Sequence, residues 1–86
     1  MPTDEQTAQI LQVIANGDAA DELADNRIIA NRLGWTLEDV ASCLDAAKES
    51  KLIWGQRSGE KPAPWFTELE LTVQGRRFLA ANPVDA

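Results

Sequence analysis

The sequence contains no histidine and only one cysteine, Cys43. A single cysteine cannot form a disulfide within the chain, and without histidine the common zinc sites lack their ligands. No apolar run approaches the ~20 residues that a membrane-spanning helix needs. The N-terminal segment MPTDEQ is acidic, unlike the basic start of a signal peptide. We therefore expect a cytoplasmic protein without a metal site or a cofactor.

Catalytic motifs are also missing. The sequence has no catalytic triad, no phosphate-binding loop and no glycine-rich dinucleotide fingerprint. Because Cys43 has no histidine to activate it, a structural thiol is expected. Glu68 and Glu70 alternate onto one strand face, but no third oxygen ligand lies close to them in sequence, which argues against a Mg²⁺ site. The sequence predicts a protein that is not an enzyme.

The residues that are present indicate one small domain with unevenly distributed charge. The chain of 86 residues is 44% hydrophobic and 26% charged, as in ordinary soluble proteins. We expect a single domain over residues 1–86, with a core over about residues 4–82 and frayed termini. The net charge is −6, and residues 1–50 hold ten acidic residues against three basic ones, whereas residues 51–86 hold four against five. A polyanion would have to meet the C-terminal half.

The first predicted helix covers about residues 4–15. Thr3 can cap it, Gln6 completes a capping box, and Gly17 is a natural stop. Helical spacing predicts a buried stripe made of Thr7, Ile10, Leu11 and Ile14. The segment GDAADEL that follows is a linker, with one or two strand residues at Leu23 and Ala24.

A short helix, a tight turn and a second amphipathic helix follow. Asp25 or Asn26 caps the first of these helices, and Gly34 ends it. Its inward residues are Ile29, Ala30 and Leu33. Thr36 caps the next helix, with Asp39 at the capping-box position. The arc predicted to be buried on that helix holds Leu37, Val40, Ala41, Leu44 and Ala47.

The opposite arc of this third helix is acidic. It presents four carboxylates and a hydroxyl, on Glu38, Asp39, Ser42, Asp45 and Glu49, and no cation. Lys48 and Lys51 fall at the later turns of the buried arc, where their methylenes can lie along the core while the ammonium groups reach water.

The C-terminal half predicts a β-hairpin and a closing helix. The segment LIWGQR (52–57) alternates as a strand with Leu52 and Trp54 on one face, SGEKPAP (58–64) is a loop, and residues 65–71 form the partner strand. The chain's three tryptophans are expected in the core, with Trp65 the most exposed of them because it adjoins the loop. Thr72 caps the last helix and Pro83 ends it.

Two segments carry a resemblance to a known superfamily. IANRLGWTLEDVASCLDAAKESKLI (29–53) resembles the helix pair of MarR- and PadR-type regulators, and ELTVQGRRFLAAN (70–82) is similar to the stretch that follows the wing in those proteins. The element order also resembles small YjcQ-type winged-helix proteins. The resemblance covers about residues 7–82 and implies an α+β winged helix-turn-helix fold: a three-helix core, a two- or three-stranded wing and a short C-terminal helix. The dimerisation helices usual in MarR and PadR proteins are not predicted.

The resemblance implies a small regulator of transcription that binds double-stranded DNA. Its third helix would read bases, yet the acidic arc would face phosphates that carry one negative charge per ~1.7 Å of duplex. The alternative DNA-contacting surface is the wing and the start of the last helix, with candidate contacts Arg57, Lys61, Arg76 and Arg77. A second hypothesis is a protein-interaction module whose acidic arc meets a basic protein partner. The sequence leaves both hypotheses open, together with the target and the oligomeric state.

Overall fold

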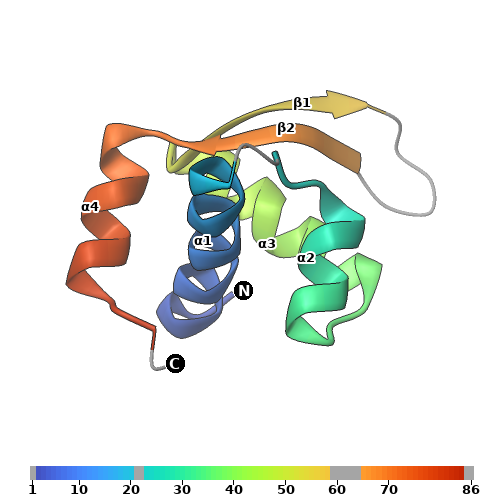
Figure 1. Ribbon diagram of the computed structural model, residues 1–86. Coiled ribbons are helices and arrows are strands. Elements are labelled where there is room, and N and C mark those ends of the chain that lie inside the picture. The colour runs from blue at the N-terminus through green and yellow to red at the C-terminus, as the bar shows by residue number, and fades with distance from the viewer. Residues whose placement is uncertain (1, 21–22, 59–64, 85–86) are drawn as a thin grey trace.

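The fold is α+β. A computed structural model describes residues 2–20, 23–58 and 65–84, and these contain four helices and a two-stranded antiparallel sheet. The β-hairpin lies across one end of the helices, and α4 packs beside α1 (Figure 1). The chain ends that we expected to fray, Met1 and residues 85–86, lie outside the described residues. The elements in chain order are α1 (Asp4–Ala19), α2 (Asn26–Leu33), α3 (Leu37–Glu49), β1 (Ile53–Ser58), β2 (Trp65–Leu71) and α4 (Val73–Ala81).

Helix α1 begins as predicted and ends later than predicted. The Thr3 hydroxyl accepts a hydrogen bond from the Gln6 N–H at 3.1 Å, and the Gln6 side chain accepts one from the Thr3 N–H at 3.0 Å, so the capping box is confirmed. Gly17 does not stop the helix, which continues to Ala19. Glycine terminates a helix when its backbone turns left-handed, and Gly34 is the only described glycine with a positive φ.

The turn between α2 and α3 follows the predicted chemistry. The Asp25 carboxylate accepts from the Ile28 N–H at 2.9 Å and caps α2. Gly34 ends that helix with φ 71°, and its N–H donates to the Ala30 carbonyl at 2.8 Å. The Thr36 hydroxyl then accepts from the Asp39 N–H at 3.1 Å and starts α3. Capping groups at both sides of Gly34 therefore fix where each helix begins and ends.

The hairpin has one irregularity and one added bridge. Trp54 pairs with Glu70 and Gln56 with Thr67, so Gly55 alone lies opposite two residues of β2, Glu68 and Leu69. Glu68 adopts a left-handed backbone conformation, with φ 55°, at this bulge. Ala24 forms an isolated antiparallel bridge with Leu69 on the other side of β2, which confirms the predicted strand pairing at this residue.

The strand phase places Trp54 outside the core, against our prediction. Ile53 and Leu71 pair on the inner face and are both buried, so Trp54 points outward and its side chain is 65% exposed. Leu52 packs against the core from just before β1 because its N–H still bonds to the Ala47 carbonyl of α3. The strand alternation therefore starts one residue later than the sequence pattern suggested.

A single core joins all the elements. Its residues with no more than 1% exposure come from α1, α2, α3 and the hairpin region: Ile10, Leu11, Ile14, Ala24, Ile29, Val40, Ala41, Leu44, Phe66 and Leu69. Two predicted members differ. Thr7 is only half-buried, and Leu37 is 37% exposed because it is the first residue of α3, beyond the buried arc.

Helix α4 is fixed to the end of α3 through Thr72. The Thr72 hydroxyl caps the helix by accepting from the Gly75 N–H at 2.9 Å, and it donates to the Lys51 carbonyl at 2.7 Å. The Thr72 N–H donates to the Leu52 carbonyl at 3.1 Å. Gly75 lies so close to Leu52 that a Cβ at this position would collide with the Leu52 carbonyl oxygen. This close approach explains in physical terms why threonine and glycine occur three residues apart here.

Candidate functional site

The predicted outward face of α3 is a surface in the structure. We call Glu38, Asp39, Ser42, Asp45 and Glu49 the acidic face. Four of these residues are exposed and Asp45 is half-buried, whereas the opposite side of α3 is buried in the core. The helical phase predicted for this segment is therefore right, apart from Leu37.

The cation of α3 is directed away from the acidic face. The Lys48 ammonium donates a hydrogen bond to the Gly55 carbonyl of β1 at 3.0 Å and lies 5.9 Å from the centroid of the Phe66 ring. Among the described residues the ion pair that forms is Arg76–Asp18, which does not involve this surface. The carboxylates of the acidic face therefore have no neutralising cation within the described parts of the chain.

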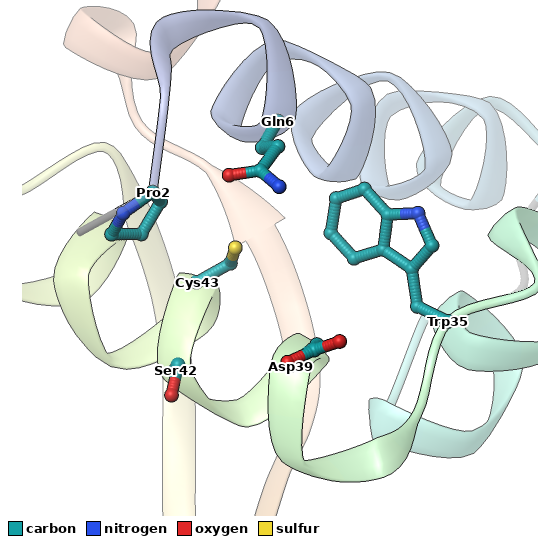
Figure 2. Close-up of a pocket in the computed structure, with 6 residues that line it drawn as sticks. All are labelled: Pro2, Gln6, Trp35, Asp39, Ser42 and Cys43. Carbon is teal, nitrogen blue, oxygen red and sulfur yellow. The ribbon is translucent and has the colours of Figure 1, made fainter.

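A hollow of about 520 Å³ opens at the N-terminal end of the acidic face. Figure 2 shows the Trp35 ring, from the turn before α3, on one side of it and the Asp39 carboxylate below. The remaining lining residues are Pro2, Gln6, Ser42 and Cys43. An aromatic ring and a carboxylate at one hollow are the two groups that attract a guanidinium or ammonium group.

Cys43 lines the hollow as a buried thiol. Its side chain is only 5% exposed, and burial raises the pKa of the thiol above its ordinary value of 9.0, with the nearby Asp39 carboxylate raising it further. The thiol is therefore protonated at neutral pH, and a protonated thiol is a poor nucleophile. The expected structural role of Cys43 agrees with its burial.

The four candidate DNA contacts do not form one cluster in the described structure. Arg57 pairs with Phe66 near the end of β1. This end of the hairpin lies away from α4, the helix that carries Arg76 and Arg77 (Figure 1). Arg76 is 3.3 Å from the Asp18 carboxylate of α1. Lys61 lies outside the described residues. The hairpin thus separates Arg57 from the two arginines of α4.

Trp54 is the surface residue that the sequence analysis missed. Trp35 and Trp65 are half-buried, and Trp35 packs against the core, whereas Trp54 is mostly exposed. The residue in the sequence that could have indicated this was Ile53, because a buried isoleucine at that position places the next residue, Trp54, on the outer face of the strand. Trp54 belongs to β1, the strand that runs along the top of the molecule in Figure 1.

Comparison with known proteins finds no match: no family model, no curated protein and no solved structure is significantly similar to the chain. Within residues 2–20, 23–58 and 65–84, no three Cys, Asp or Glu side chains are grouped so that they could hold a metal ion. None of the helices in these ranges combines the length and the apolar character needed to cross a bilayer.

Proposed function

We propose that this chain is a non-enzymatic protein-interaction domain on a winged-helix frame, and that the acidic face of α3 binds a basic segment of a partner protein. The frame rests on the element order, on the tight turn at Gly34 between α2 and α3, and on the hairpin followed by α4. In such a frame α3 is the helix that would enter a DNA groove. The charge of this helix argues for a different partner.

Electrostatics favour a basic protein over DNA on this surface. Four carboxylates would point at phosphates, and Lys48, the cation of α3, is engaged with the Gly55 carbonyl on the hairpin side. DNA binding is driven by cations that displace counterions from the phosphates, so this face would repel a duplex. The same charges would accelerate and orient the docking of a positively charged segment.

The observation that carries the proposal is the hollow shared by Trp35 and Asp39. A partner arginine entering it would place its guanidinium plane against the indole ring and its N–H groups toward the Asp39 carboxylate. Glu38 precedes Asp39 on α3 and Asp45 follows Ser42 by three residues, and these two carboxylates would attract the neighbouring basic residues of the partner. The hollow supplies a defined anchoring position on a face that otherwise offers only charge.

The alternative is a small DNA-binding regulator that contacts duplex DNA through the hairpin and the start of α4. It draws on Arg57 and Arg77, which are exposed and are not part of the described ion pair. Against it, Arg57 lies near the far end of β1 whereas Arg77 lies on α4, which follows the other end of the hairpin, and Arg76 is paired with Asp18. A duplex would have to be long enough to reach both ends at once.

The test is an NMR titration of the ¹⁵N-labelled protein with a short arginine-rich peptide and, separately, with duplex DNA. We expect the peptide to shift the Trp35 indole signal and the amides of Glu38, Asp39 and Ser42, and the DNA to cause little change at low salt. Shifts confined to Arg57 and to the first turns of α4 on adding DNA, with none from the peptide, would contradict the proposal and favour the alternative.

A matched pair of variants separates the acidic face from net charge. Glu38→Gln with Asp39→Asn removes two carboxylates from the acidic face, and Glu68→Gln with Glu70→Gln removes two from the hairpin. The first variant should bind the peptide at least about tenfold more weakly, a loss of about 1.4 kcal/mol. The second should bind nearly as well as the parent. Equal losses in both variants would show that only the overall charge matters.

A further inference from the structure

A second concave surface lies on the side of the molecule where α3 ends, β1 begins and α4 starts. This groove has a volume of about 530 Å³. Its main lining side chains are Lys48, Lys51, Trp54, Thr72, Val73 and Gln74. None of these belongs to the acidic face, so the groove is a separate surface with its own chemistry.

The groove exposes two large apolar side chains. Trp54 of β1 is 65% exposed and Val73 of α4 is 66% exposed, and both line it. Water contact with an indole and a valine is unfavourable, and tryptophan is among the side chains that contribute most to protein interfaces. An apolar side chain from a partner that entered between them would remove both from water.

Positive charge surrounds these apolar walls. Lys48 and Lys51 both line the groove, no carboxylate does, and Arg77 follows Val73 by one turn on the same face of α4. In a chain with a net charge of −6, this is a local reversal of sign. The neighbouring acid is Glu70, which pairs with Trp54 across the hairpin and does not line the groove.

Hydrogen bonds hold the walls of the groove in place. Thr72 connects α4 to the end of α3 through the Lys51 and Leu52 carbonyls, and Gly75 allows the two segments to approach closely. The bond from the Lys48 ammonium to the Gly55 carbonyl connects α3 to β1. A groove formed before binding loses little conformational freedom when it is filled.

We infer that this groove binds an acidic peptide segment with one apolar anchor side chain. The anchor would pack between Trp54 and Val73, and the carboxylates on either side of it would face Lys51 and Arg77. Charge complementarity selects this occupant, because a basic segment would be repelled and a neutral one would leave the cations unpaired. A single nucleic acid strand would also gain stacking on Trp54, but its continuous phosphate charge would extend beyond the groove cations and be repelled by the rest of a chain with a net charge of −6. This inference goes beyond the proposed function and does not depend on it.

The test is a selection of peptides from a displayed random library on the immobilised full-length chain, with the Trp54→Ala variant used to remove peptides that bind elsewhere. Trp54 is exposed, so this substitution leaves the core intact. We expect the recovered peptides to share acidic residues around one aliphatic or aromatic residue. A synthetic peptide of the recovered sequence should bind the Trp54→Ala and Lys51→Glu variants at least about tenfold more weakly than the parent.

Arg57→Glu provides the matched control, because it makes the same charge change at an exposed residue near the far end of the hairpin. The affinity of the Arg57→Glu variant for the recovered peptide should fall by no more than about twofold to threefold, because salt screens a charge change at this distance from the groove. The inference is overturned by any of four results: no enriched peptide, recovered peptides without acidic residues, equal binding to the Lys51→Glu and Arg57→Glu variants, or displacement of the peptide by oligo-thymidine at equal concentration. Self-association of the chain that Trp54→Ala abolishes, without any peptide enrichment, also overturns it in favour of a second copy. Binding of the arginine-rich peptide to α3 should be unchanged by Trp54→Ala, so failure of either proposal can be recognised separately.

Discussion

The side-chain oxygen of Asn26 accepts a hydrogen bond of 2.8 Å from the backbone N–H of Phe66, although the two residues are 40 positions apart. Asn26 is 1% exposed at the start of α2, and Phe66 is fully buried in β2. A buried N–H with no partner is costly, so this bond fixes the hairpin against the helix pair. It therefore helps to determine how the acidic face and the groove are placed within one molecule.

Replacing Asn26 tests that connection. Asn26→Ala leaves the Phe66 N–H without its acceptor and should lower the free energy of unfolding by about 1–3 kcal/mol. Asn31→Ala, at an exposed position on the same helix, should change it by less than about 0.5 kcal/mol. Urea unfolding followed by tryptophan fluorescence measures both. Similar losses in the two variants would mean that the buried bond contributes nothing specific.

Gly75 provides a second test, of the packing between α4 and the end of α3. Gly75→Ala puts a methyl group against the Leu52 carbonyl oxygen, and backbone has to move to admit it. We expect a loss of about 1–3 kcal/mol, the usual cost of overpacking. The neighbouring Gln74→Ala, at an exposed position, should be close to neutral. Thermal unfolding measures both variants. A Gly75→Ala protein that unfolds at the same temperature as the parent would disprove the close contact.

The bulge at Glu68 predicts a substitution that stabilises the protein. A left-handed backbone costs an L-residue about 1–2 kcal/mol, whereas glycine adopts it freely and loses about 0.5–1 kcal/mol through chain entropy. Glu68→Gly should therefore raise the free energy of unfolding by about 0.5–1 kcal/mol. Glu70→Gly, in the same strand but without a positive φ, should lower it by a similar amount. Denaturant titrations should therefore show that the free energy of unfolding rises in the Glu68→Gly variant and falls in the Glu70→Gly variant.

The Cys43 thiol predicts a loss of stability in alkaline solution. Burial raises the pKa of the folded-state thiol above 9.0, so the unfolded chain releases this proton at a lower pH than the folded chain does. The stabilisation is complete below the unfolded-state pKa and disappears as the pH rises through the folded-state value. The parent should lose more stability than Cys43→Ala between about pH 8 and about pH 10. An equal loss in both proteins would show that another group is responsible.

Local chemistry made much of the fold predictable from the sequence. The Thr3–Gln6 box and the glycine at position 34 act on backbone groups within a few residues, so their patterns determine the helix ends directly. Gly17 was misinterpreted because tertiary packing can keep a glycine helical. Trp54 was misplaced because alternate residues of a strand point to opposite faces, and the sequence pattern had to decide which set points inward. The large apolar side chain of Trp54 favoured the wrong set.

The two candidate surfaces were only partly predictable. The acidic face follows from helical spacing along α3 alone. The hollow at its end could not be predicted, because Pro2 and Gln6 meet Trp35 and Asp39 only after α1 packs beside α3. The groove likewise combines Lys51, Trp54 and Val73 from three separate elements. The pairing of Arg76 with Asp18 could not be predicted for the same reason, because these residues are 58 positions apart and meet only when α4 packs beside α1.

We propose that the acidic face of α3 binds a basic protein segment and not DNA. The most direct measurement compares the parent with a variant carrying Glu38→Gln, Asp39→Asn, Asp45→Asn and Glu49→Gln, each titrated with the arginine-rich peptide and with duplex DNA at low salt. We predict that the variant loses the peptide, with at least about a tenfold fall in affinity, while its affinity for DNA stays close to that of the parent. A large rise in DNA affinity with no change in peptide binding would contradict the claim, because it would show that α3 faces the phosphates.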